Sequence, residues 1–340
     1  MTLNIISKQA NRNRITGPKK VLDNTLKGLD AIGVNYVFNQ PINEYDYNWI
    51  HDNQEAIIEA GFVGKAVLVG PNTAVLPSDL PLFRKKLPQG SIYIHPGFWS
   101  AEVWRFLGYS ESRLDFWPAG INMEEFIATP REDKSKILLY FKQRELSLLE
   151  DIKKIITNLG FEYILIHYGF YKEQEYKKAL KECRFGVWIG CSESQGIGLQ
   201  EALATDLPLI VLDATSIFDT VSLDLQSSYQ YNFPKSLQAI KTTSAPYFDS
   251  RCGIIIEDIK GLKKSIQFMG EHIDKYKPRE FVEENLSLEI SAELLVGYFE
   301  QMDNQESKSY NYQKLSKILY YFGLFFQKWA WIWIWRKIIR

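Results

Sequence analysis

Residues 185–212 read FGVWIGCSESQGIGLQEALATDLPLIVL, and this stretch decides how the second half of the chain folds. An apolar run at 185–189 leads into a polar turn that contains glycine, and a helical pattern follows at 198–204. A turn with proline then precedes a second apolar run at 209–213. Short apolar runs bounded by turns are typical of buried strands, so the stretch predicts a parallel strand–helix–strand unit.

The same alternation of apolar runs and helical patterns extends through the whole chain, which predicts parallel sheets with helices on both faces. The remaining strands are expected at 3–7, 35–39, 65–69, 91–95, 115–118, 137–141, 163–167 and 253–256. The remaining helices are expected at 21–32, 49–60, 100–107, 146–159, 172–183 and 262–272.

Two such series predict two domains, and 340 residues are enough for both. We expect an α/β protein with two doubly wound, Rossmann-like domains facing across a cleft, at 1–128 and 135–304, followed by an aromatic and basic helical tail at 305–340. The polar stretch TPREDKS at 129–135 would be the hinge linker. Open α/β sheets bind ligands at the carboxyl ends of their strands, so the site is expected there.

The composition and the N-terminal residues indicate which partners and which cellular compartment to expect. The net charge of -1 gives no overall field that would attract nucleic acid. The three cysteines make no C-x-x-C pair and no zinc pattern, which indicates reduced thiols. The first ten residues lack a secretory signal pattern, and no Asp-x-Asp metal motif occurs. We therefore expect a cytoplasmic protein with no metal site.

The polar turn between 189 and 198 has the chemistry of an anion site. The N-terminus of a helix attracts anions, and Gly196 and Gly198 allow the backbone at Ile197 to approach a ligand. Glu193 and Glu201 lie on either side, and carboxylates accept hydrogen bonds from the hydroxyls of ribose and hexose. Phosphates next to sugar hydroxyls predict a sugar nucleotide as the ligand.

Basic and aromatic residues at two other strand ends complete the expected donor site. Lys142 and Arg144 follow the strand at 137–141, in LLYFKQR, where they would meet phosphates. His167 ends the strand at 163–167, and its neighbourhood would contact the nucleobase or else pack in the core.

The segment ESQGIGLQE resembles the E-x7-E signature of retaining glycosyltransferases with the GT-B architecture, of the family 4 type. Glu193, Glu201 and Gly196 match its two glutamates and its glycine. Supporting segments occur in the family's order from about residue 15 to 212. They are Thr16-Gly17-Pro18 before a helix, WPAGIN at 117–122, the strand ILLYFKQR, and Asp206-Leu207-Pro208 after the motif.

The sequence also departs from the family pattern. Gln195 stands where an aromatic residue is usual. Many relatives carry a histidine after the fourth strand, where this chain has Asn72 in VGPN. His95 lies one strand later, and either a structural role or a role in catalysis or acceptor binding is open to it.

The resemblance implies transfer of a hexose-type sugar from a nucleotide-diphosphate sugar to a glycan or glycoconjugate, with retention of anomeric configuration and without a cofactor. From the residues and the resemblance together, we expect catalysis from Glu193, Lys142 and His95, and donor binding from Gly17, Arg144, His167, Gly196, Ile197, Gly198 and Glu201. A nucleotide-sugar epimerase and a non-catalytic sugar-binding scaffold are alternatives on the same architecture.

The tail carries the one segment that concerns a membrane, ILYYFGLFFQKWAWIWIWRKII at 318–339. Trp329, Trp331, Trp333 and Trp335 recur at every second residue and are followed by three basic residues. Tryptophan favours the bilayer interface, and basic residues favour anionic headgroups. Residues 320–340 would therefore lie on the inner face of a membrane, or else pack across the domains.

Overall fold

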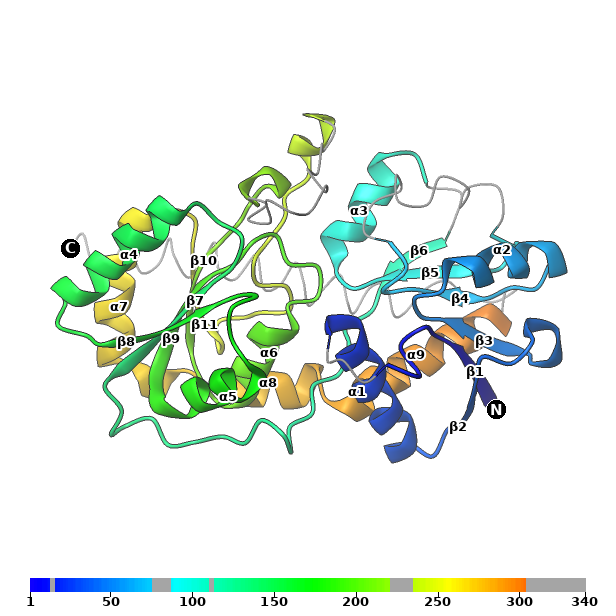
Figure 1. Ribbon diagram of the computed structural model, residues 1–340, viewed down its shortest axis with the longest axis horizontal. Helices are drawn as coiled ribbons and strands as arrows, with labels where there is room; N and C mark the ends of the chain where they lie inside the picture. The colour runs from blue at the N-terminus through cyan, green and yellow to red at the C-terminus, as the bar shows by residue number, and fades with distance from the viewer. Residues whose placement is uncertain (13–15, 75–86, 110–112, 221–234, 304–340) are drawn as a thin grey trace. The chain divides into compact units, whose positions relative to one another are not determined.

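The computed structural model describes residues 1–12, 16–74, 87–109, 113–220 and 235–303 (Figure 1). The chain forms two compact units. The first comprises Met1–Asn122 together with the described residues that follow Glu283, and the second comprises Met123–Glu283. Each unit has its own sheet, and every strand pair in both sheets is parallel. The expected α/β class with two parallel sheets is confirmed.

The first unit is built on a six-stranded sheet with the order β2-β1-β3-β4-β5-β6. Apolar side chains from its strands and from α2 and α3 form its core. The strands are β1 (Thr2–Ile6), β2 (Asn35–Phe38), β3 (Tyr47–Ile50), β4 (Leu68–Val69), β5 (Ile92–His95) and β6 (Arg113–Phe116). The helices are α1 (Gly17–Ala31), α2 (Gln54–Val63), α3 (Phe98–Phe106) and α9 (Leu288–Asp303).

One strand of this sheet corrects the sequence prediction. The expected helix at 49–60 was wrong at its start, because Trp49 and Ile50 belong to β3 and are fully buried between β1 and β4. Helix α2 begins only at Gln54, where the Asn53 side chain accepts a hydrogen bond from the Glu55 N–H at 3.2 Å. The cap, rather than the preceding apolar run, sets the helix start.

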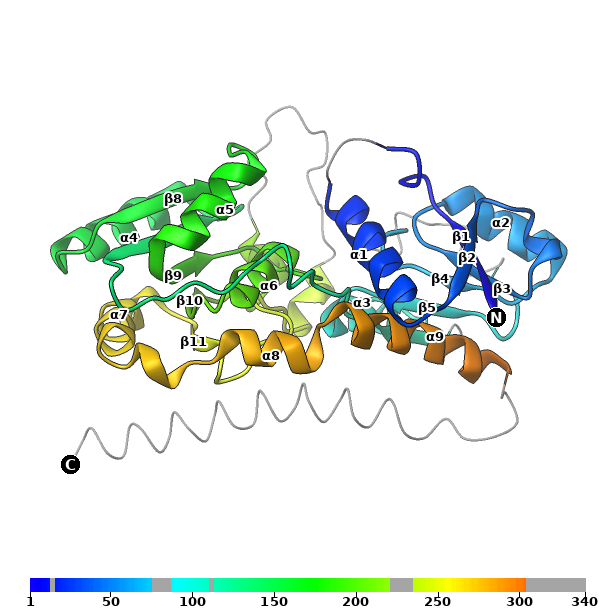
Figure 2. The ribbon, with the colours of Figure 1, turned by 90° about the horizontal axis from the view of Figure 1, so that it is seen from below.

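The end of the chain returns to the first unit. Helix α9 lies beside α1 (Figure 2). Gly28 of α1 has no Cβ, and a Cβ there would collide with the carbonyl oxygen of Leu288. The Trp117 indole donates to Ser291 O at 2.8 Å, and Ser291 Oγ donates to Pro118 O at 2.8 Å. Residues 284–303, which the sequence grouped with the second domain, are therefore part of the first unit's packing.

The second unit is built on a five-stranded sheet with the order β11-β10-β9-β7-β8. Its strands share an apolar core with the helices at 146–158 and 262–271. The strands are β7 (Lys136–Phe141), β8 (Tyr163–His167), β9 (Cys183–Ile189), β10 (Leu209–Leu212) and β11 (Gly253–Ile256). The helices are α4 (Leu146–Asn158), α5 (Glu173–Glu182), α6 (Ile197–Ala204), α7 (Leu262–Glu271) and α8 (Pro278–Asn285).

The stretch at 129–135 is anchored in the second unit, although its composition predicts a hinge linker. Arg131 is buried and donates to Leu180 O at 2.6 Å and to Cys183 O at 2.8 Å. Arg131 also donates to Thr205 O, just after α6. A guanidinium satisfies carbonyl groups that helix ends leave unpaired, and its charge suits the negative end of the helix dipole.

None of the helices in the described part of the chain has both the length and the apolar character required to cross a bilayer. The tail at 305–340, with its tryptophans, lies outside the described residues.

Candidate active site

The candidate site is at the carboxyl end of the second unit's sheet, where the turn after β9 leads into α6. Gly196 adopts a left-handed conformation, with φ of 72°, at the N-cap of α6. Glycine adopts this conformation readily and offers no side-chain acceptor to the first-turn N–H groups. The N-terminus of α6 thus has no side-chain cap, and its anion-binding role stays a prediction.

Gln195 holds the turn against α6. Its Nε2 donates to Gln200 Oε1 at 3.1 Å, and Gln200 Nε2 donates back to Gln195 O at 2.6 Å. Both side chains are buried. Gln195 therefore fixes the turn by hydrogen bonds to the helix.

Lys142 and Glu193 form an ion pair at this edge. Lys142 follows β7 and Glu193 follows β9, which are neighbouring strands, and Lys142 Nζ lies 2.7 Å from Glu193 Oε1. The two side chains are only 16% and 13% exposed. Burial alone would lower the pKa of Lys142, but the charge of Glu193 and the hydrogen bond to it raise the pKa overall. Lys142 is therefore a cation at neutral pH.

Tyr168, in the turn after β8, lies against the same cation. Lys142 Nζ is 4.5 Å from the centre of the Tyr168 ring, which is a cation–π distance. Tyr168 and Phe170 are exposed aromatic side chains. The turn therefore adds aromatic surface next to the charged pair.

Arg144 lies across the ends of β9 and β10. Its guanidinium donates to Gly190 O at 3.0 Å and to Leu212 O at 3.4 Å. Burial lowers the pKa of Arg144, while the charges of Asp219 and Asp213 oppose this shift. Arginine remains protonated in either case, so a second cation is present at the carboxyl edge of the sheet.

A loop that the sequence did not single out supports the turn from the other side. Asp213 Oδ1, at the end of β10, accepts hydrogen bonds from the Ser244 N–H at 2.6 Å and from Thr243 Oγ1 at 2.8 Å. The carbonyl of Thr243 accepts the Glu193 N–H at 2.9 Å. Burial raises the pKa of Asp213. The loop that accepts the Glu193 N–H thus lies far from Glu193 in sequence, which local patterns cannot reveal.

Glu201 is in the third position along from Gly198 on α6 and is 3% exposed. Its charge contributes to the raised pKa of Tyr176, for which burial is the main cause. The Tyr176 hydroxyl donates to Gly198 O, at the start of the same helix. The structure therefore places Glu201 beside α5 residue Tyr176, while Glu193 is paired with Lys142.

His167 ends β8 with its ring between aromatic side chains. The ring centre lies 5.2 Å from that of Phe141 and 4.8 Å from that of Phe170. Its Nε2 is buried and has no hydrogen-bond partner in the described chain. Burial lowers the pKa of His167, so its ring is neutral at pH 7. The His167 ring therefore packs among aromatic side chains. The exposed aromatic residues Tyr168 and Phe170 are in the turn that follows it.

The two remaining predicted residues belong to the first unit. Gly17 opens α1, which is capped by a 3.3 Å hydrogen bond from the Lys19 N–H to Thr16 Oγ1. His95 is 0% exposed, and its ring lies 4.3 Å from that of Tyr93, centre to centre. Neither ring nitrogen of His95 has a hydrogen-bond partner among the described residues, and burial lowers its pKa to about 3. His95 is thus an interior aromatic, and this position does not support the catalytic role expected for it.

Comparison with solved structures agrees with this fold. A sucrose-phosphate synthase from Thermosynechococcus elongatus has a TM-score of 0.54 and 13% identity, covering 90% of this chain and 100% of that one. The lipopolysaccharide outer core galactosyltransferase WaaB has a TM-score of 0.50 and 12% identity, with 90% and 100% covered. A putative UDP-N-acetylglucosamine 2-epimerase from Listeria monocytogenes has a TM-score of 0.50 and 10% identity, with 92% and 99% covered.

The two transferases define the class to which the architecture corresponds. Both are GT-B glycosyltransferases, and this chain has the same α/β fold with two parallel sheets. At these identities the likeness concerns the fold alone. No family model matches the sequence, and a search of curated protein sequences found no significant match.

Proposed function

We propose that the protein is a glycosyltransferase that moves a hexose-type sugar from a nucleotide-diphosphate sugar to a glycan or glycoconjugate acceptor, with retention of configuration. The observation that carries the proposal is the buried Lys142–Glu193 pair beside Arg144 and the N-terminus of α6. Fold neighbours that are glycosyltransferases support sugar transfer in general.

Each group in this site has a task in the proposed reaction. The diphosphate would bind to Lys142, Arg144 and the first N–H groups of α6, at Ile197 and Gly198. The bond between the anomeric carbon and the phosphate oxygen breaks, and a bond from the acceptor oxygen to that carbon forms. The acceptor hydroxyl releases its proton to the leaving diphosphate or to water. Cations held in place beforehand stabilise the charge that develops on the leaving group.

Glu193 would exchange partners during donor binding. In the structure its carboxylate neutralises Lys142 at 2.7 Å. A diphosphate carries more charge and would compete for Lys142, which leaves Glu193 to accept hydrogen bonds from sugar hydroxyls. Glu201 and the turn after β8, with His167, would contribute to binding of the nucleoside.

The decisive experiment is a mass-spectrometric screen of nucleotide-diphosphate sugars with and without acceptor mixtures, on the wild type and on Glu193→Gln. We expect the wild type to release nucleoside diphosphate, and Glu193→Gln to lose this turnover while keeping its fold. Glu257→Gln is the matched control, since Glu257 pairs with Lys241 at the exposed surface of the same unit. Equal turnover in Glu193→Gln and wild type would refute the assignment.

An epimerase is the second candidate, because a putative UDP-N-acetylglucosamine 2-epimerase shares the fold. The two activities differ in what the donor becomes when acceptor is absent. An isomerised sugar with free nucleotide, and no acceptor product in any mixture, would favour the epimerase. A chain that binds donors without any turnover would instead be a sugar-binding scaffold.

We also propose that residues 320–340 hold the enzyme at a membrane surface and that its acceptor is delivered there. The tryptophans and the basic residues Arg336, Lys337 and Arg340 support this from sequence. Deletion of 320–340 should release the protein from liposomes that contain anionic lipid, measured by co-sedimentation. Equal sedimentation of the full and shortened chains would contradict it.

A further inference from the structure

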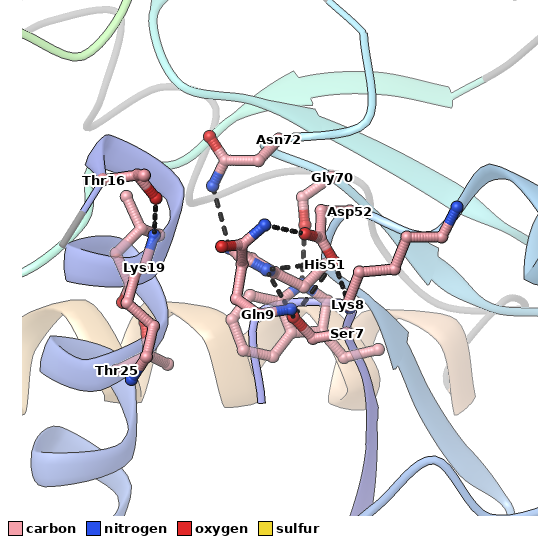
Figure 3. A network of polar contacts seen from close by, with 12 residues as sticks. Ser7, Lys8, Gln9, Thr16, Lys19, Thr25, His51, Asp52, Gly70 and Asn72 are labelled. Carbon is pink, nitrogen blue, oxygen red and sulfur yellow. Dashed lines mark hydrogen bonds and ion pairs between the residues drawn. The ribbon is translucent and has the colours of Figure 1, made fainter. Parts of the chain in front are cut away.

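A buried polar network lies at the carboxyl ends of three neighbouring strands of the first unit (Figure 3). Ser7 follows β1, His51 and Asp52 follow β3, and Asn72 follows β4. Gln9 joins the network from the loop after β1. Sequence patterns do not reveal it, because a helix at 49–60 would place His51 away from any strand end.

Asp52 is the charged centre of the network. Its Oδ1 accepts hydrogen bonds from the Ser7 hydroxyl at 3.0 Å and from the Lys8 N–H at 2.8 Å, and its Oδ2 accepts one from Gln9 Nε2 at 2.7 Å. Burial alone would raise the pKa of Asp52, but the neighbouring His51 and the hydrogen bonds from Gln9 and from the Lys8 N–H lower it to about 2. Asp52 is therefore an anion, and every partner must donate to it.

The charge on Asp52 determines the direction of each further hydrogen bond. The Ser7 hydroxyl has one hydrogen, which it gives to Asp52, so Ser7 Oγ accepts from its other neighbours. His51 Nδ1, 3.1 Å away, must then be the donor. In the tautomer with the proton on Nδ1, the other nitrogen, Nε2, is an acceptor, and Asn72 Nδ2 donates to it at 2.8 Å.

Both carboxamides are consequently held with their oxygens turned away from the network. Gln9 Nε2 faces Asp52, and Asn72 Nδ2 faces His51, so Gln9 Oε1 and Asn72 Oδ1 point elsewhere. Gln9 is 6% exposed, and its Oε1 has no hydrogen-bond partner among the described residues. A buried oxygen without a donor is unfavourable, which indicates that a ligand supplies the donor.

We propose that Gln9 Oε1 and Asn72 Oδ1 accept hydrogen bonds from hydroxyl groups of the acceptor saccharide. The inference rests on the proposed sugar transfer and assigns acceptor recognition to named residues of the first unit. Two acceptor oxygens beside the anion Asp52 favour a neutral hydroxyl and repel a phosphate or carboxylate. The cation of Lys8 lies 2.5 Å from Glu55, which neutralises it.

The test uses the full chain and the methyl glycosides of glucose, galactose and N-acetylglucosamine, with binding followed by saturation-transfer NMR titration. The wild type should bind at least one probe. Gln9→Met and Asn72→Leu approximate the side-chain volume but remove the whole carboxamide, both the oxygen and the N–H group that donates to Asp52 or His51, and each should weaken binding by about tenfold. Gln40→Met is the matched control, because the exposed Gln40 carboxamide donates to Phe38 O at 2.9 Å.

A second measurement varies the probe and keeps the wild-type protein. Each deoxy form of the bound glycoside lacks one hydroxyl group. One deoxy form should bind the wild type more weakly than the parent glycoside does, whereas Gln9→Met should bind that deoxy form and the parent with equal affinity. The site is refuted if both variants bind the glycosides like the wild type, or if the wild type binds none of them. Binding of spermidine in place of glycosides would also refute the site, since Gln9 Oε1 and Asn72 Oδ1 would then accept hydrogen bonds from a cation and not from sugar hydroxyls.

Donor turnover separates this inference from the proposed function. If the wild type consumes nucleotide-diphosphate sugars but both variants keep full glycoside affinity, only the acceptor site is wrong. If no donor binds or turns over while Gln9 and Asn72 still control glycoside binding, sugar transfer is wrong and the network remains a saccharide site.

Discussion

Lys142 Nζ lies 2.7 Å from Glu193 Oε1, so the carboxylate neutralises the cation that would bind a diphosphate in the proposed reaction. The pair joins the ends of β7 and β9, and little solvent reaches it. Charge pairs of this kind resist screening by salt. In the proposed reaction the ligand displaces Glu193 from Lys142, and a diphosphate would do so more readily than a neutral sugar.

Replacing Lys142 by methionine should lower kcat for donor turnover by about 10²–10³, because a donor to the developing charge is removed. It should also destabilise the fold by on the order of 3 kcal/mol, since the largely buried Glu193 carboxylate loses the cation that neutralises it. The double variant Lys142→Met/Glu193→Gln should regain the stability and stay inactive. Steady-state kinetics and thermal unfolding measure the two effects, and a single variant with wild-type kcat/KM would exclude Lys142 from catalysis.

Gly196→Ala should weaken donor binding. Its φ of 72° is strained for alanine by about 1–2 kcal/mol, and a Cβ there would lie 3.1 Å from Pro246. Gly160→Ala is the matched control, because Gly160 has φ of 80° and a Cβ there would meet nothing within 4 Å in the described structure. Both variants should lose similar stability in thermal melting, but only Gly196→Ala should raise the donor KM. An equal rise in both would point to general destabilisation.

His95→Phe should leave turnover within about twofold of wild type, because the ring is an interior aromatic beside Tyr93 and Trp104. The pKa of His95 is about 3 when folded, against 6.5 for the free group, so the unfolded chain binds the extra proton between these values. The wild type loses stability as pH falls from 6.5 towards 3, and the variant should lose less. Urea unfolding at several pH values measures this, and a large loss of kcat would restore His95 as a catalytic candidate.

Excess EDTA should leave donor turnover unchanged. Lys142, Arg144 and the N-terminus of α6 would provide the positive charge that a metal ion otherwise brings to a diphosphate. The measurement is the initial rate with EDTA and after addition of Mg²⁺ or Mn²⁺. A rate that collapses with chelator and returns with metal would contradict the prediction.

The sequence predicts much of the second unit, because the residues at which its strands end can be recognised from local patterns. The apolar runs at 137–141 and 185–189 end at the residues where β7 and β9 end. Neighbouring parallel strands end at one edge, which brings Lys142 to Glu193. Thr243 and Ser244 could not be predicted, since the loop that holds them is fixed by Asp213, far away in sequence.

The first unit shows where local patterns fail. β3 is only four residues long and lies close before α2, so its apolar residues read as the start of the helix. The sequence pattern therefore does not show that His51 and Asp52 lie at the end of a strand. His95 does follow an apolar run, but its side chain packs inward against Tyr93 and Trp104 instead of reaching the edge. Which way a terminal side chain turns depends on packing that the sequence does not display.

Because the chain passes between units after Asn122 and again after Glu283, neither coding half corresponds to a folded unit. A recombination event that exchanged the first 122 codons alone would join a new α1 to the old α9. The Leu288 carbonyl, which the absence of a Cβ at Gly28 admits, would then face a different helix, and any residue other than glycine at that position would collide with it. Inheritance of a new first unit therefore requires two coordinated crossovers, or a donor gene that has kept both sides of this helix contact.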